Sequence, residues 1–211
     1  MRVVLASTSP RRKELLALLG VPFDVCPPTF LEQPIPGLSP REQVARFALE
    51  KARSVACLRP EDIVLGSDTV IESHGRVLGK PLDLADARTM LTSLAGESHD
   101  VHTAVALCAG SQAIEVVEVV TAAVSMKADT GGAVERYLET GESLGKAGAY
   151  SIQGQGGDLI EKIEGDFTAV VGLPLRVTAR LLAAGGYPVV SQDVEDLYRR
   201  KPYPNWNRFG G

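Results

Sequence analysis

The sequence has little of what marks several large classes of protein. Its 211 residues include only three cysteines, widely spaced and without a C-x-x-C pair, which favours free thiols in a reducing cytoplasm over a disulfide framework. No apolar run approaches the roughly 20 residues of a membrane span, and the apolar stretch near the start is too short for a signal peptide. The formal net charge of −4 lacks the basic excess that nucleic acids and anionic membranes favour in their partners. We therefore expect a cytoplasmic protein that binds no nucleic acid and no membrane.

Several catalytic patterns are also missing. The sequence contains no G-x-S-x-G elbow and no complete G-x-x-x-x-G-K-[ST] loop, which argues against an acyl-transfer hydrolase and a P-loop ATPase. His99 and His102 form an H-x-x-H pair, but on a strand this spacing directs the two rings to opposite faces. We therefore expect no metal site from these histidines.

What is present is an alternation of strand and helix patterns with 45% hydrophobic residues, ample for a core. Strand patterns occupy residues 3–6, 63–71, 77–79, 101–108 and 116–125, and helical patterns occupy residues 10–19, 39–58, 83–94, 132–139 and 173–183. The alternation predicts an α/β fold with a mixed β-sheet and flanking helices, in one domain over residues 1–190. Residues 191–211 have no hydrophobic period, and we expect this tail to be flexible or docked on a partner subunit.

The first strand leads into a turn rich in hydroxyl groups and arginine. Ser9 is a good helix N-cap and Pro10 suits the first helical position. A helix start offers unpaired N–H groups and a positive dipole end, and the guanidinium groups of Arg11 and Arg12 would suit a polyphosphate there. The alternative is a capped surface helix with two solvated arginines.

Lys51 and Asp68 interrupt apolar patterns. Lys51 lies within the apolar stripe of the helix over residues 39–58, where it either extends outward to solvent or directs its ammonium group into a dry cleft. Asp68 lies inside a strand, where a carboxylate is costly unless it is paired, bound to metal or at a strand end. If the hairpin turns at residues 74–75, Thr69 pairs with Lys80, which places Lys80 beside Asp68 across the ladder. A structural ion pair explains that arrangement as well as a catalytic one does.

In their order along the chain, these features resemble the Maf family of nucleoside-triphosphate pyrophosphatases over about residues 2–188. The matching motifs are A-S-T-S-P-R-R at residues 6–12, Glu32, K-A at 51–52, G-S-D-T-V at 66–70, L-G-K-P at 78–81 and G-A-Y-S-I-Q-G at 148–154. The resemblance implies an α/β fold of two lobes around a central cleft. It also implies hydrolysis of a nucleoside triphosphate to the monophosphate and pyrophosphate, in a homodimeric enzyme that needs a divalent metal cation, Mg²⁺ or Mn²⁺.

The resemblance implies roles for individual residues. Asp68 acts as general base or metal ligand, and Glu32 is the second carboxylate that a metal could use. The positive groups around the triphosphate are Lys51, Lys80, Arg11 and Arg12, with Ser7 as a donor to phosphate oxygens.

The subgroup that looks most similar acts on dTTP and UTP, with Arg11, Thr69 and Gln153 as the residues of substrate specificity. A glutamine amide can accept from N3–H of uracil or thymine and donate to O4, provided that a neighbour fixes its orientation; we expect the backbone of residues 154–157 to do so. Two alternatives stay open: a nucleotide-binding regulator of cell division or septation with incidental hydrolysis, and a pyrophosphatase of the 7-methyl-GTP type.

Overall fold

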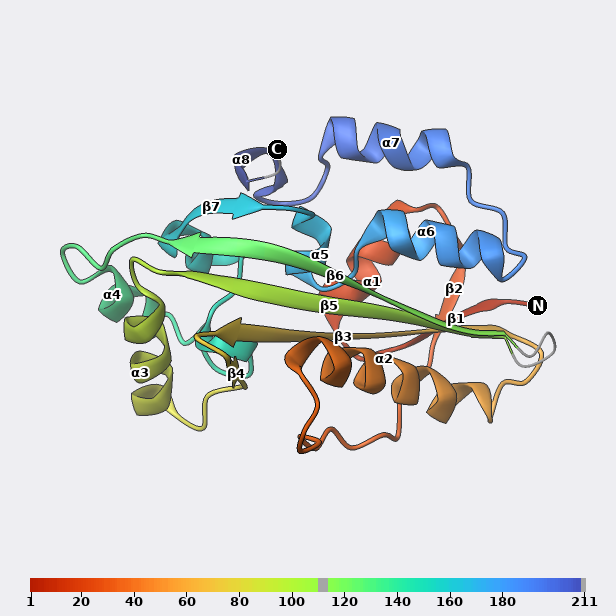
Figure 1. Ribbon diagram of the computed structural model, residues 1–211. Helices are drawn as coiled ribbons and strands as arrows, with labels where there is room; N and C mark the ends of the chain where they lie inside the picture. The colour runs from red at the N-terminus through yellow and green to blue at the C-terminus, as the bar shows by residue number, and fades with distance from the viewer. Residues whose placement is uncertain (110–113, 210–211) are drawn as a thin grey trace.

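The computed structural model describes residues 1–109 and 114–209, and its centre is a mixed sheet of seven strands (Figure 1). The strands are β1 (Val3–Ala6), β2 (Phe23–Val25), β3 (Ile63–Ser73), β4 (Arg76–Leu78), β5 (Ser98–Ala109), β6 (Ile114–Met126) and β7 (Ile160–Glu164). Their order is β2-β1-β3-β5-β6-β7, with β4 paired to β3 outside this path. β1 is parallel to both of its neighbours, and the other pairings are antiparallel. The predicted mixed α/β fold is confirmed.

Helices cover both faces of the sheet. They are α1 (Pro10–Leu18), α2 (Pro40–Ala56), α3 (Leu84–Leu94), α4 (Ala133–Glu139), α5 (Phe167–Val171), α6 (Leu175–Ala184), α7 (Ser191–Arg200) and α8 (Trp206–Phe209). In Figure 1, α2 lies below the long strands β3, β5 and β6, and α6 and α7 lie above them. Within the described residues, no helix has both the length and the apolar character that crossing a membrane requires.

The two faces of the sheet carry separate hydrophobic cores. Because successive side chains of a strand point to opposite faces, Val4 and Ala6 of β1 pack on the α2 side, whereas Val3 and Leu5 join the larger core on the other side. The larger core includes buried residues of α1, α3, α5 and α6. The same alternation in β3 decides which of its polar side chains face α2.

The long predicted elements are present, with ends displaced by at most three residues. The capping box of α2 is confirmed: the Ser39 side chain accepts from the Glu42 amide, and the Glu42 carboxylate accepts from the Ser39 amide. Ser9 lies at the N-cap of α1, but its side chain makes no capping bond. Sequence reasoning missed β2, β7 and α5, which have three to five residues each, too few for a period to show. It also missed α7, with ten residues, and the short α8.

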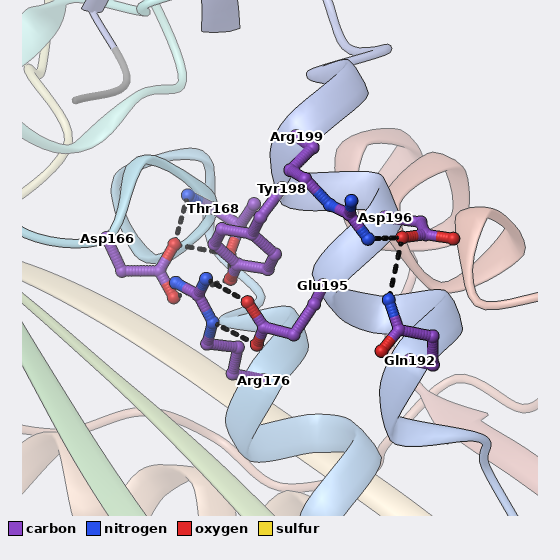
Figure 2. A network of polar contacts seen from close by, with 8 residues as sticks. All are labelled: Asp166, Thr168, Arg176, Gln192, Glu195, Asp196, Tyr198 and Arg199. Atoms are coloured by element: carbon purple, nitrogen blue, oxygen red, sulfur yellow. Dashed lines mark hydrogen bonds and ion pairs between the residues drawn. The ribbon is translucent and has the colours of Figure 1, made fainter.

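The C-terminal segment packs on its own chain. Residues 191–209 form α7 and α8, and Trp206 is 1% exposed with its ring stacked 5.5 Å from that of Phe167. Figure 2 shows Tyr198 extending from α7 toward Asp166 and Thr168, and its hydroxyl donates to Asp166 at 2.8 Å. Of the two expectations for this segment, docking occurs, but on the body of the same chain. The expectation that no hydrophobic period marks this segment is wrong for α7, because Val194 and Leu197 are buried one helical turn apart. After α7, single aromatic side chains such as Trp206 make the contacts.

Candidate active site

A cleft of about 410 Å³ opens at the edge of β3. β1 pairs with β3 only as far as Ala6 opposite Gly66, and β4 begins its pairing at Leu78 opposite Ile71. Asp68 lies in the stretch between these two pairings. Side chains from both faces of the sheet therefore meet in one cleft.

Positive side chains dominate the charged lining of this cleft. Its charged residues are Arg11, Arg12, Lys51, Lys80 and Lys146, with the carboxylates Glu32 and Asp68. The alternative of two solvated arginines on a surface helix does not describe Arg11 and Arg12, because both line the cleft. Sequence reasoning missed Lys146; its position two residues before the G-A-Y-S-I-Q-G motif was the available signal.

Lys51, Asp68 and Glu32 form a compact charged cluster. The ammonium nitrogen of Lys51 lies 2.5 Å from Asp68 Oδ1 and 2.5 Å from Glu32 Oε1. Lys51 is 6% exposed and Asp68 is 5% exposed, so Lys51 does not extend outward to solvent. Glu32 reaches the cluster from the loop before α2 and keeps a side chain that is 45% exposed.

A glycine allows α2 to approach this part of β3. A Cβ atom at Gly66 would lie 2.2 Å from the carbonyl oxygen of Ala48, so no other residue fits without moving the helix. Gly66 and Asp68 lie on the same face of β3, two residues apart. The close approach at Gly66 therefore brings Lys51, one helical turn after Ala48, to the Asp68 carboxylate.

The environment moves the pKa values of the two carboxyl groups in opposite directions. Burial raises the pKa of Asp68 above its ordinary value, and this effect exceeds the opposing attraction of Lys51 and Arg12. Burial also raises the pKa of Glu32, but the hydrogen bond from Lys51 and the nearby positive charges outweigh it, so the net shift is downward. Asp68 is thus the stronger base of the two.

The other face of β3 carries hydrogen bonds from the Arg12 guanidinium group to uncharged acceptors. Arg12 Nη2 donates to Thr69 Oγ1 at 3.3 Å, and Arg12 Nε donates to the carbonyl oxygen of Gly172 at 3.0 Å. Gly172 has a φ of 121°, a conformation that side chains with a Cβ rarely adopt. Arg11 instead donates to Ser151 Oγ at 3.0 Å. The structure therefore places Arg12, rather than Arg11, in contact with Thr69.

Ser7 and Lys80, two further residues predicted at the site, lie directly after β1 and shortly after β4. Ser7 is buried after β1, and its hydroxyl accepts from the amide of Ser9 at 3.2 Å. Lys80 is exposed at the cleft and makes no ion pair with another described residue.

The predicted ladder position of Lys80 is wrong. The hairpin register places Ser73 opposite Arg76 as expected, but the ladder ends at Ile71 opposite Leu78, so Thr69 and Lys80 do not pair. Asp68 takes its ion pair from Lys51 on α2 instead.

Gln153 lies beside the cleft rather than in its lining. The preceding residues Ser151 and Ile152 line the cleft, whereas the Gln153 amide donates to Tyr203 Oη at 2.5 Å and to Glu14 Oε2 at 3.5 Å. The expectation that the backbone of residues 154–157 holds this amide is therefore wrong; the hydroxyl group of Tyr203 does so. The glycines serve close packing instead, since a Cβ at Gly157 would lie 2.7 Å from Asn205 Nδ2.

The histidines take structural roles on opposite faces of β5, as expected. His99 Nε2 shares a hydrogen bond of 2.7 Å with the Tyr150 hydroxyl, and His102 bonds Thr121 and Glu72. Across residues 1–109 and 114–209, no three His, Cys, Asp or Glu side chains are grouped to hold a metal ion. The cleft offers a pair of carboxylates instead.

An α/β fold whose cleft joins clustered cations to two carboxylates defines a protein with a site suited to a polyphosphate. Residues 2–185 match the family model described as Maf-like protein. The chain is 46% identical over 190 residues to the dTTP/UTP pyrophosphatase of Anaeromyxobacter dehalogenans strain 2CP-1, which covers 89% of this chain and 96% of the relative. It is also 46% identical over 188 residues to the dTTP/UTP pyrophosphatase of Symbiobacterium thermophilum, with 89% and 96% covered. The chain belongs to the Maf family.

Proposed function

We propose that this protein is a nucleoside triphosphate pyrophosphatase that hydrolyses dTTP and UTP to the monophosphate and pyrophosphate. The observation that carries the proposal is the cluster of Lys51, Asp68 and Glu32 in a cleft lined by further cations. Relatives named dTTP/UTP pyrophosphatase at 46% identity support the same activity. A pure nucleotide-binding regulator has no need of the carboxylate pair, so that alternative is less favoured.

Asp68 is suited to take a proton from the attacking water. Its raised pKa brings the carboxylate closer to the range in which a general base works at neutral pH. Attack on the α phosphorus transfers the water oxygen to that atom, and the bond to the pyrophosphate oxygen breaks. The negative charge that develops on the leaving pyrophosphate is matched by Lys80, Arg12 and Lys146 along the cleft.

Asp68 and Glu32 are the residues that would hold the divalent cation. Both carboxylates lie 2.5 Å from the same ammonium nitrogen of Lys51, so they are close enough together to bind one cation jointly. Mg²⁺ commonly binds through one or two carboxylates together with phosphate oxygens of a substrate, which fits this donor set. When bound, Mg²⁺ or Mn²⁺ supplies further positive charge to the phosphates.

The proposal includes base recognition by Arg11 and Thr69, which line the cleft, together with Gln153, which lies beside it. Arg11 contacts Ser151, two residues before Gln153, so the phosphate-binding turn is joined to the segment that carries the glutamine. The dTTP/UTP relatives favour these pyrimidine nucleotides over the 7-methyl-GTP alternative. A homodimer in the cytoplasm completes the proposal; the free thiols of Cys26, Cys57 and Cys108 are consistent with a reducing compartment.

A pyrophosphate-release assay over all nucleoside triphosphates, with Mg²⁺ or Mn²⁺, tests this function. We expect dTTP and UTP to be hydrolysed fastest, with monophosphate and pyrophosphate as the first products and no activity in EDTA. Release of orthophosphate as the first product would contradict the proposal, because it places the attack at the γ phosphorus. Faster hydrolysis of 7-methyl-GTP than of UTP would favour the sister subgroup.

A further inference from the structure

A chain of hydrogen bonds links the C-terminal segment to Gln153. The Tyr203 hydroxyl donates to Glu14 Oε2 at 2.8 Å, and Gln153 Nε2 donates to the same hydroxyl oxygen at 2.5 Å. Glu14 lies on α1, one turn after Arg11, so these hydrogen bonds connect three segments that are far apart in the sequence.

The Glu14 carboxylate, at the end of this series of hydrogen bonds, fixes which atom donates in each of them. The Tyr203 hydroxyl gives its single proton to the Glu14 carboxylate oxygen, which accepts it at 2.8 Å. The hydroxyl oxygen is then left as an acceptor, and only the nitrogen of the Gln153 amide can face it. The amide oxygen must point away, and within residues 1–109 and 114–209 it has no hydrogen-bond partner.

Tyr203 is itself held firmly. Its side chain is 6% exposed, and its ring packs edge-on against Phe167 with the centroids 6.4 Å apart. Two residues later, Asn205 Nδ2 donates to the carbonyl oxygen of Ile152 at 2.7 Å, which ties the C-terminal segment to the residue next to Gln153. The family match ends at residue 185, so this anchor comes from outside the matched region.

We propose that Tyr203 is a positioning residue for base selection, which orients the Gln153 amide so that its oxygen accepts from N3–H of uracil or thymine. The inference rests on the proposed function, because it gives Gln153 its base. Cytosine carries an acceptor at N3, so an amide oxygen held in this orientation meets it with two acceptors face to face. Without the Tyr203 hydroxyl, only the longer bond from Gln153 Nε2 to Glu14 Oε2, at 3.5 Å, orients the amide. The amide then turns over more readily, and a turned amide pairs with cytosine instead.

Tyr203→Phe tests this inference, because it removes the hydroxyl and keeps the packed ring. The measurements are kcat/KM for UTP and CTP, and the binding by calorimetry of their α,β-imido analogues, which are not hydrolysed. We expect the preference for the uracil nucleotide to fall about five- to tenfold in both measurements, the scale of one lost hydrogen bond. The variant should differ from the wild type in its preference for UTP over CTP, whereas its melting temperature should be nearly the same.

Tyr198→Phe is the matched control. Tyr198 lies in the same C-terminal segment, and its hydroxyl also forms hydrogen bonds with two side chains, those of Asp166 and Thr168, but not with Gln153. It should leave the preference between UTP and CTP unchanged. In a Gln153→Ala background, Tyr203→Phe should have no further effect on that preference.

The outcomes separate this inference from the proposed function. A wild-type protein that binds the UTP analogue selectively but hydrolyses no UTP would refute the function and leave the binding test of Tyr203 intact. Equal binding of the two analogues by the wild type would overturn the inference, as would an unchanged preference in Tyr203→Phe. An equal loss of preference in Tyr198→Phe would assign the effect to general loosening of the segment and would also overturn it.

Discussion

The two sides of the cleft are built by different means. On the α2 side, Lys51, Asp68 and Glu32 hold opposite charges at 2.5 Å, two of the three side chains being buried. On the other side, which we call the neutral side, buried hydrogen bonds join uncharged groups, such as Gln153 with Tyr203 and His99 with Tyr150, and between the described residues no ion pair forms across the cleft wall. The first arrangement suits proton transfer and the binding of charged phosphates. The second suits recognition of the hydrogen-bonding edge of a base, where the direction of donors and acceptors matters more than charge.

The sharpest way to break the charged side is Asp68→Asn. This change keeps the size of the side chain but removes the negative charge and the basic oxygen. We expect kcat for UTP to fall at least about 100-fold, the lower end of general-base effects. The circular dichroism spectrum and the binding of the α,β-imido UTP analogue should show a folded protein that still takes up nucleotide. Near-normal turnover in that folded variant would remove Asp68 from both proposed roles.

Lys51→Met tests whether the charged side also stabilises the fold. Loss of the ammonium group leaves Asp68 buried without its partner, which we expect to lower the free energy of unfolding by about 3 kcal/mol, together with the activity. Urea unfolding measures the first effect, and addition of Asp68→Asn to the same chain should recover most of it. A melting temperature equal to or above that of the wild type would show that Lys51 does not compensate the Asp68 charge.

Lys80→Met is the matched control for this effect. Lys80 also lines the cleft, but it is exposed and forms no ion pair with the part of the chain that the structure describes. The same loss of charge should therefore reduce hydrolysis and leave urea unfolding unchanged. A destabilisation as large as that of Lys51→Met would mean that burial is not what separates the two lysines.

On the neutral side, we expect acid to lower the stability of the fold through protonation of His99. Burial lowers the pKa of His99 from 6.5 to about 4. The unfolded chain therefore binds a proton at His99 at a higher pH than the folded protein does, so the stability from this residue is complete above pH 6.5 and is lost as the pH falls toward 4. The loss amounts to at most about 3 kcal/mol for a shift of this size.

His99→Gln provides the comparison for this pH effect. Glutamine does not titrate, so the stability difference between wild type and variant should shrink as urea unfolding is measured from pH 7.5 down to pH 4.5. Carboxyl groups titrate in both proteins and cancel in the difference. A difference that stays constant over this range would show that His99 does not remain neutral in the folded protein.

The charged side was largely predictable from the sequence. On the neutral side, the family resemblance indicates Thr69 and Gln153, but not Tyr203, the partner that orients the Gln153 amide. Lys51 and Asp68 are conspicuous because each interrupts an apolar pattern, and the capping box of α2 fixes where the helix begins. The position of Lys80 was missed because counting along a hairpin assumes a continuing ladder, whereas β4 ends at Leu78. Tyr203 lies 50 residues from Gln153 in the short connection between α7 and α8, and only the docking of the C-terminal segment brings the two together.

The smallest expected effect comes from Gln153→Glu on the neutral side. An ionised glutamate offers only acceptors, so it can still receive N3–H but cannot donate to O4 or to Tyr203. Tyr203 has one proton, already given to Glu14, and the two carboxylates would repel each other across this chain. We expect kcat/KM for UTP and dTTP to fall by about tenfold, the scale of the one hydrogen bond to the base that is lost at O4, while their ratio stays the same. The ratio is unaffected because the two bases differ only in the methyl group at C5, with which the side chain of residue 153 forms no hydrogen bond. Kinetics with dTTP, UTP and 5-methyl-UTP measure both quantities, and an unchanged rate for all three would mean that Gln153 does not contact the base.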